Sequence, residues 1–230
     1  MKAVQESKRV GLVLCGCGAW DGTDIHETVL TMLALERAGA TVVCAAPDMR
    51  QLHVLNHQSI EEMDETRQVT IETARLARGD VIDLKALSGD DLDAVILPGG
   101  HGAIKQLSQF AIQGPRTTVN AELQRLLDEM ARAQKPIGAI SAAAITLVRA
   151  LHSSRPRVTI GNDQATATAL KTMGGRHQAR KADQIHIDRQ NLIITTPGYM
   201  ASSRITQVAV GIEKLVQTVL AMTVDHRRPS

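Results

Sequence analysis

The sequence is poor in aromatic residues, with one Trp, one Tyr and one Phe among 230. A protein that binds nucleic acid by stacking bases on aromatic side chains is therefore not expected. The formal net charge of +2 is also too small to indicate nucleic acid or an anionic membrane as a partner. The core has to be built from Val, Ile, Leu, Ala and Met.

Cysteines and long apolar runs are scarce as well. Three cysteines, Cys15, Cys17 and Cys44, cannot form a disulfide framework, so we expect a reducing, cytoplasmic setting. Neither they nor the eight histidines have the spacing of a metal site, and we expect no metal and no cofactor. The apolar runs at residues 10–15 and 137–148 are too short to span a membrane.

The remaining composition, 43% hydrophobic and 22% charged, is that of an ordinary globular chain. Short β-branched and aliphatic runs alternate with segments of helical periodicity. Such apolar runs are typical of strands that are buried on both faces. The predicted strands are residues 9–15, 41–46, 93–97 and 136–140, with further candidates at 157–160 and 192–195. The predicted helices are residues 24–38, 68–77, 119–130, 142–151 and 208–219.

This alternation predicts an α/β fold in which a doubly wound parallel sheet is covered by helices on both faces. We expect a single domain over residues 1–230, with a disordered tail at 225–230. In such sheets, ligands bind beyond the carboxyl ends of the strands. The residues of interest should therefore lie in the loops after Cys15, Leu97 and Ile140, and after Thr195.

The loop after the first predicted strand contains several acidic residues. Glu27 should lie in the first turn of the following helix and point back toward the sheet. Taken alone, Asp24 and Glu27 are more simply explained as residues that complement the helix dipole. His26 and His101 are the two histidines that the topology brings toward the same end of the sheet, although a lone histidine in a loop is usually only solvated.

The loop after residues 93–97 reads Pro98-Gly-Gly-His-Gly102. Its glycines allow backbone N–H groups to approach an anion or oxyanion closely, but a tight turn explains them equally well. Ser141 follows the fourth strand and is flanked by small residues, as a side chain exposed on a strand-to-helix elbow requires. The pattern is not G-x-S-x-G, and by itself it favours a helix N-cap over a nucleophile for Ser141.

An ordered set of motifs, spread over residues 8–222, resembles the ElbB-type branch of the DJ-1/PfpI superfamily. Single motifs such as PGG are weak, and the ordered combination is specific. The segments that carry the resemblance are Leu14-Cys-Gly-Cys-Gly-Ala-Trp-Asp-Gly-Thr-Asp-Ile-His-Glu27, Ala46-Pro-Asp48, Asn56-His57, Glu65-Thr-Arg67, Leu97-Pro-Gly-Gly-His-Gly-Ala103, Lys135-Pro-Ile-Gly138, Thr159-Ile-Gly161 and Thr195-Thr-Pro-Gly-Tyr-Met200.

The resemblance implies a flavodoxin-like three-layer sandwich, a homodimer, and a relation to class I glutamine amidotransferase domains. The ElbB branch is linked by name to isoprenoid biosynthesis. Its implied activity is that of a glyoxalase, a lyase that converts a small dicarbonyl, glyoxal or methylglyoxal, into a 2-hydroxy acid without glutathione.

The resemblance also implies the site residues. In the superfamily, a Cys lies on the elbow, a Glu contacts its sulfur, and glycine N–H groups near PGG stabilise oxyanions. Glu27 matches the Glu, and Gly99 and Gly100 match the glycines. The implied catalytic pair is Ser141 and Glu27, in a pocket that contains Gly99, Gly100, His101, Cys17 and Ala142.

The sequence departs from the family at the elbow itself. Ser141 stands where the family has its reactive Cys, and Ser141-Ala-Ala-Ala144 replaces a stretch that usually reads Cys-x-Ala-Pro. A serine hydroxyl is a much weaker acid than a thiol and normally needs an adjacent His as base. Ala142 also removes the His that follows the nucleophile in some relatives.

Four hypotheses remain open at this point. The chain is an active glyoxalase-type enzyme with a slowed first step, or a catalytically silent relative with a binding or regulatory role. Alternatively, Ser141 is a substitution made to trap a ligand, although the changed residues 142–144 favour a natural variant. In the fourth hypothesis the reactive thiol is Cys17, while Cys15 and Cys44 are inert core residues.

Overall fold

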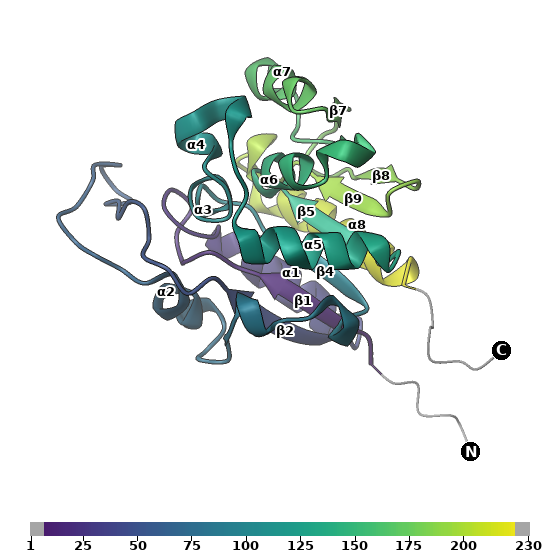
Figure 1. Cartoon of the computed structure of the whole chain (residues 1–230), viewed down its shortest axis with the longest axis horizontal. Helices are drawn as coiled ribbons and strands as arrows, with labels where there is room; N and C mark the ends of the chain where they lie inside the picture. The colour runs from purple at the N-terminus through teal and green to yellow at the C-terminus, as the bar shows by residue number, and fades with distance from the viewer. Residues whose placement is uncertain (1–6, 224–230) are drawn as a thin grey trace.

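The computed structural model of the chain describes residues 7–223; the tail predicted at 225–230 lies outside them. Its main feature is a seven-stranded sheet with the strand order β3-β2-β1-β4-β5-β9-β8 (Figure 1). The strands are β1 (Arg9–Val13), β2 (Thr41–Ala46), β3 (Ile82–Asp83), β4 (Ala94–Leu97), β5 (Ile137–Ile140), β8 (His186–Asp188) and β9 (Ile193–Thr196).

The pairing of these strands confirms the predicted doubly wound α/β sheet. The strands from β3 to β9 pair in parallel. The exception is β8, which pairs antiparallel with β9 at the edge. This three-residue strand carries too short an apolar pattern to be recognised in the sequence.

Helices cover both faces of the sheet, as Figure 1 shows, and each face has its own core. On one face, α5 (Ala121–Arg132) and α6 (Ala143–Ala150) pack their buried side chains against Val13, Val95 and Ala139. On the other, α1 (Ile25–Arg37) and α8 (Ile205–Ala221) pack against the alternate strand residues. The three-layer sandwich implied by the resemblance is therefore present.

The predicted strand at residues 157–160 is not part of the main sheet. Only β6 (Arg157–Val158) forms there, and it pairs with β7 (Arg176–His177) in a separate two-stranded sheet. The intervening α7 (Gln164–Thr172) was not predicted, because a single buried apolar residue, Leu170, gives it almost no helical periodicity. Asp163 starts this helix, its Oδ1 accepting a hydrogen bond from the Thr166 N–H at 2.7 Å.

Further short helices were also not predicted. They are α3 (Gly102–Lys105) and α4 (Phe110–Gln113), which lie between β4 and α5. The remaining long element, α2 (Val69–Leu76), matches the segment predicted at residues 68–77 within a residue at each end.

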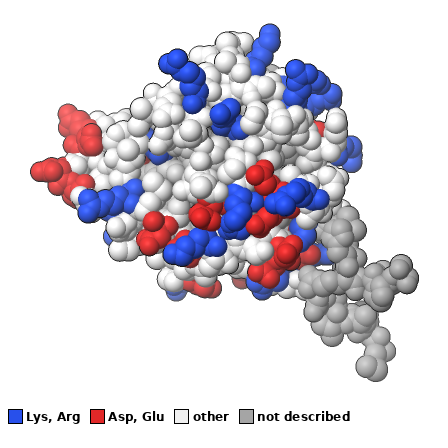
Figure 2. Space-filling view, viewed as in Figure 1, with Lys and Arg blue, Asp and Glu red and all other residues white. Residues whose placement is uncertain are grey.

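The charged side chains do not form a field of one sign on the face drawn in Figure 2, where basic and acidic groups are interspersed. Some are paired along α5, where Arg125 contacts Glu122 and Glu129. Within residues 7–223, no helix is both long and apolar enough to cross a bilayer.

The strand order places β1 in the middle of the sheet, with β2 on one side and β4 on the other. The chain therefore reverses its direction of winding between β1 and β4, which leaves a crevice beyond the carboxyl ends of these two strands. Ligand sites of such sheets lie at this crevice, beyond the carboxyl ends of the strands. The loops after β1, β4, β5 and β9 meet at this point, as the contacts below show.

Candidate functional site

Ser141 forms the elbow between β5 and α6. Its backbone has a left-handed conformation with φ of 53°, which costs a non-glycine residue about 1–3 kcal/mol. The Ser141 N–H donates to the Thr196 carbonyl at 2.9 Å and so fixes the elbow against β9. The N-cap favoured from the sequence is wrong, because the cap position of α6 is Ala142 and no side chain caps the helix.

The Ser141 side chain instead hydrogen-bonds to Glu27, which is fully buried. The Oε2 of Glu27 accepts from the Gly99 N–H at 2.8 Å, and its Oε1 accepts from the Tyr199 N–H at 3.1 Å. The dipole explanation therefore applies to Asp24, whose Oδ1 caps α1 by accepting from the Glu27 N–H at 2.9 Å. The Glu27 side chain turns inward and joins the ends of three strands.

This packing depends on a glycine at position 99. A Cβ added to Gly99 would lie 2.6 Å from Glu27 Oε2 and 2.7 Å from Ser141 Cβ, closer than such atoms pack. Any side chain at Gly99 would separate the carboxyl from the hydroxyl. The glycines of the PGG turn therefore serve the site as well as the turn.

Burial raises the pKa of Glu27 from its ordinary 4.5 to about 8, and the nearby charge of Asp24 adds to this shift. The hydrogen bonds from Tyr199, Gly99 and Ser141 partly oppose it, because they stabilise the ionised form. At neutral pH the carboxyl therefore holds its proton. It loses that proton in a pH range accessible to catalysis, which is the property that a residue exchanging protons with a ligand needs.

Ser141 opens into a pocket of about 630 Å³ at the carboxyl ends of the strands. The wall is mostly apolar side chains with a few polar groups, which is typical of sites for small molecules. The lining residues are Ala19, Trp20, Asp24, His26, Gly100, His101, Ile104, Phe110, Ser141, Ala142, Ile145, Thr166, Tyr199, Met200 and Ser203.

The residues expected in the pocket are distributed as follows. Gly100, His101 and Ala142 line it, whereas Gly99 lies beneath it in contact with Glu27. Cys17 does not line it, although its loop does. Burial, followed by the charge of Glu72, raises the pKa of the half-buried Cys17 thiol and so disfavours the reactive thiolate.

Neither histidine of the pocket hydrogen-bonds to Ser141 within residues 7–223. His26 Nδ1 lies 2.7 Å from the hydroxyl of Tyr199. His101 stands edge-on to Trp20, with 5.0 Å between ring centroids, and burial, then Lys105, lowers its pKa. The two histidines do lie at the same end of the sheet, as expected, but neither is placed as a serine's base.

Two backbone N–H groups at the pocket are free. Within the part of the chain that the structure describes, neither the Gly100 nor the Ala142 N–H donates a hydrogen bond. Gly100 belongs to the PGG turn, and Ala142 precedes the first residue of α6, where the helix dipole favours negative charge. This is the chemistry of an oxyanion site.

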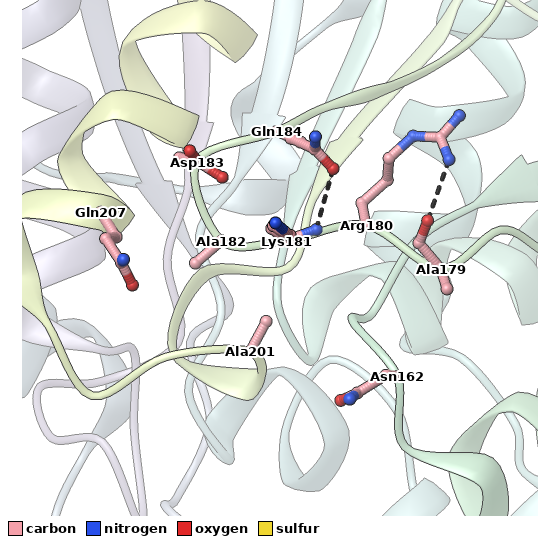
Figure 3. A pocket seen from close by; sticks show the side chains of 9 residues that line it. All are labelled: Asn162, Ala179, Arg180, Lys181, Ala182, Asp183, Gln184, Ala201 and Gln207. Atoms are coloured by element: carbon pink, nitrogen blue, oxygen red, sulfur yellow. Dashed lines mark hydrogen bonds between the residues drawn. The ribbon is translucent and has the colours of Figure 1, made fainter.

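A second hollow, of about 560 Å³, is drawn in Figure 3 and includes Ala201, the residue after the turn at Gly198–Met200, in its lining. It is formed largely by the loop at residues 179–184, whose polar groups bond to one another: Arg180 donates to the Ala179 carbonyl, and Gln184 accepts from the Lys181 N–H. Among its lining residues there is no serine, no cysteine and no buried carboxyl. The Ser141 pocket is therefore the better candidate.

The other two cysteines are buried in strands or directly after one. Burial raises the pKa of Cys15 to about 12 and that of Cys44 to about 11, so both thiols stay protonated, as expected for core residues. Within residues 7–223, no group of three or more His, Cys, Asp or Glu side chains is arranged to hold a metal ion.

The raised pKa of Glu27 predicts how the stability of the protein depends on pH. The folded state keeps this proton up to about pH 8, whereas the unfolded chain releases it near 4.5. Stability from this group is therefore complete below pH 4.5 and is lost as the pH rises to about 8. In Glu27→Gln this loss, on the order of a few kcal/mol, is absent.

Thermal or urea unfolding of both proteins across this pH range measures the difference. The readout is the slope against pH and not the absolute stability, because a Gln amide cannot accept both backbone hydrogen bonds. Parallel slopes for the two proteins would contradict the buried carboxyl.

Comparison with known proteins places this geometry in a family. The sequence profile of the DJ-1/PfpI family matches residues 13–196. The human glutamine amidotransferase-like class 1 domain-containing protein 3, mitochondrial, is 40% identical over 225 residues, which cover 94% of this chain and 83% of that protein. The zebrafish ES1 protein, mitochondrial, is 34% identical over 231 residues, or 93% of this chain and 86% of that protein.

Among solved structures, an isoprenoid biosynthesis protein with an amidotransferase-like domain from Ehrlichia chaffeensis superposes with a TM-score of 0.88. It is 30% identical and covers 94% of this chain and 99% of its own. The VC2308 protein, 20% identical with a TM-score of 0.59, shares the fold.

These relatives correct the expected location. The human and zebrafish proteins, and a rat homologue 39% identical, are mitochondrial, so the cytoplasmic prediction is wrong. It rested on a low cysteine count, which indicates that thiols stay reduced and does not distinguish one reducing compartment from another.

The family match covers most of the chain, and the four relatives from human, rat, zebrafish and Ehrlichia chaffeensis share at least 30% identity over more than nine-tenths of it. The fold also agrees with what the resemblance implied. The chain therefore belongs to the DJ-1/PfpI family.

Proposed function

We propose that the chain is a glyoxalase-type protein of the ElbB branch, acting on 2-oxoaldehydes such as methylglyoxal with Ser141 in place of the thiol. The observation that carries this proposal is that Ser141 and the buried, proton-bearing Glu27 pack together against Gly99, where an added Cβ would lie within 2.7 Å of both side chains. A nucleophile and an acid–base group in direct contact at a pocket floor are the parts this reaction needs. The similarity to the isoprenoid biosynthesis protein is consistent with the ElbB branch.

The proposed reaction begins when Ser141 Oγ attacks the aldehyde carbon and forms a hemiacetal, while ionised Glu27 accepts the hydroxyl proton. The aldehyde oxygen becomes an alkoxide, which the N–H groups of Gly100 and Ala142 are available to stabilise.

Glu27 first returns the hydroxyl proton to this alkoxide, which completes the hemiacetal and restores the carboxylate. The carboxylate then takes the proton of this carbon and delivers it to the neighbouring ketone carbon through an enediol, while the hemiacetal O–H proton passes to the ketone oxygen. The first carbon is oxidised to a serine ester and the second is reduced to an alcohol, so no external oxidant is needed. Water hydrolyses the ester, and a 2-hydroxy acid leaves.

A second candidate is binding or regulation without turnover. It is favoured by the contacts of the two pocket histidines, because His26 meets the Tyr199 hydroxyl, His101 stands against Trp20, and neither hydrogen-bonds to Ser141 among the described residues. Among the described residues, the only base in contact with the hydroxyl is Glu27, which is protonated at neutral pH. The hydroxyl would then serve as a donor to a carbonyl ligand that is never attacked.

We further propose that the protein acts as a homodimer through α1. Ile25, Val29 and Leu33 recur at four-residue spacing on this helix and are 42%, 49% and 40% exposed. Residues at this spacing lie on one face, so they form an apolar stripe beside the pocket residue His26. The opposite face of this helix packs against the sheet, so the exposed stripe is free to contact another chain. In a symmetric dimer, the same stripe of a second copy would cover it.

The thiol substitution tests the reaction. In Ser141→Cys, loss of methylglyoxal should be faster than in the natural chain by orders of magnitude, since each ~1.36 kcal/mol taken from the barrier is worth tenfold. Ser141→Ala is the matched control without a nucleophile. Equal rates for the natural chain and the Ser141→Cys variant would contradict the role of the thiol, and no turnover by either would favour the binding role.

The pH dependence tests Glu27. Because it must be ionised to accept the hydroxyl proton, kcat/KM should rise with pH and level off above about 8. Asp24→Asn keeps a cap residue on α1 but removes a charge that raises the Glu27 pKa, so the midpoint should move to lower pH. A midpoint that does not respond to Asp24→Asn would assign the titration to another group.

The apolar stripe of α1 predicts the oligomeric state. Sedimentation velocity should give a mass of about twice 24.8 kDa, and Val29→Glu should convert the dimer to monomer. Ile71→Glu is the matched control, because Ile71 is also an exposed aliphatic residue, 62% accessible, on the separate helix α2. A dimer that survives Val29→Glu, or dissociates equally with Ile71→Glu, would place the interface elsewhere.

A further inference from the structure

The Phe, the Tyr and the Trp of this chain all lie in the wall of one pocket. The sequence has one of each, and Trp20, Phe110 and Tyr199 all line the Ser141 pocket. They come from three separate segments: the loop after β1, the helix α4 and the turn after β9. Fifteen of 230 residues form this wall, so a random distribution would seldom gather all three there.

The rest of the wall is largely apolar. Ile104, Ile145 and Met200 extend the surface begun by the aromatic side chains. Cavities of ~300–1,000 Å³ enclose drug-sized ligands in proteins, and this one measures about 630 Å³. Methylglyoxal is far smaller and would leave most of the apolar surface in contact with water.

The pocket also lacks a cation for an anionic ligand. Among the described residues that line it there is no Lys or Arg, whereas the acidic residue Asp24 is one of them. The charge of Lys105 acts on His101, but its ammonium donates to the Trp20 carbonyl at 2.9 Å. Apart from the histidines His26 and His101, a carboxylate or phosphate on the ligand would therefore find no basic side chain in the wall and would face the carboxyl of Asp24, whereas a neutral ligand avoids this cost.

We propose that the pocket selects uncharged 2-oxoaldehydes that carry an aryl or similarly bulky apolar substituent over small dicarbonyls. The aldehyde is held at Ser141, Gly100 and Ala142, and the substituent packs among Trp20 and Phe110. That the ligand carries an aldehyde rests on the proposed function. The preference for a bulky apolar substituent rests only on the residues that line the pocket. For phenylglyoxal the reaction adds water and yields mandelate by the same internal proton transfer.

The single Trp gives a binding assay that does not depend on turnover. Trp20 is the source of the one indole N–H cross-peak in a ¹H–¹⁵N correlation spectrum of the whole protein. Acetophenone and acetone are unreactive probes that share the carbonyl and differ in the aryl group. In Ser141→Ala, acetophenone should shift this peak with a Kd at least tenfold below that of acetone. The reason is that contact between two aromatic rings changes a Kd by about tenfold.

Phe110 offers the specific test and its control. Phe110→Ala should weaken acetophenone binding about tenfold and leave acetone unchanged. Ile112→Ala, on the same short helix but 63% exposed and outside the pocket, should change neither. If Phe110→Ala does not fold, Phe110→Leu keeps an apolar side chain and removes only the ring.

Turnover separates this inference from the proposed function. In the more active of the natural chain and the Ser141→Cys variant, kcat/KM for phenylglyoxal should exceed that for methylglyoxal at least tenfold. Equal Kd values for the two ketones, or a higher kcat/KM for methylglyoxal, would overturn the proposed selection even if the reaction itself is real. Acetophenone binding without any dicarbonyl turnover would support the selection and refute the glyoxalase.

Discussion

A single buried carboxyl connects the parts of this site. Glu27 leaves the first turn of α1, takes one hydrogen bond from the turn after β4 and another from the turn after β9, and contacts the Ser141 side chain after β5. These loops are far apart in the sequence and are adjacent only because the sheet is doubly wound. Burying a carboxyl is costly unless its oxygens are satisfied, and here backbone groups satisfy both. The elbow, the glycine turn and the Tyr199 turn are thus held in one arrangement.

The same arrangement separates the chemistry from recognition. The reactive groups lie at the pocket floor, where burial sets the pKa of Glu27 and two N–H groups remain free among the described residues. Apart from the turn at Tyr199, much of the wall comes from segments that take no part in the carboxyl's hydrogen bonds, including α4 and α6. The substituent that the pocket accepts can therefore change without disturbing the floor, as happens when a family keeps its fold and varies its substrates.

In the proposed reaction, a hydroxyl at position 141 makes a greater demand on Glu27 than a thiol would. A thiol near neutral pH already supplies some thiolate, but a hydroxyl must lose its proton during the attack. Glu27 retains its contact with this position and has a pKa of about 8, which makes it a stronger base than an ordinary carboxylate. The pocket therefore combines a buried carboxyl, two backbone N–H groups that are free among the described residues, and a hydroxyl at the elbow.

The sequence by itself determined the order and type of the longer elements and the end of the sheet where the site lies. Buried strands such as Thr41–Ala46 have nearly continuous apolar runs, and their alternation with helices leaves few topologies. It did not reveal short elements such as β8 or α7, which are held by tertiary contacts and have little apolar periodicity of their own. Only the tertiary structure decided that Glu27 turns inward and that Ser141 is no helix cap. It also decided that Cys17 lies outside the pocket lining, which includes Trp20, Phe110 and Tyr199. The physical reason is that hydrogen bonds and contacts between distant loops depend on distances in space, and single-sequence patterns record only spacing along the chain.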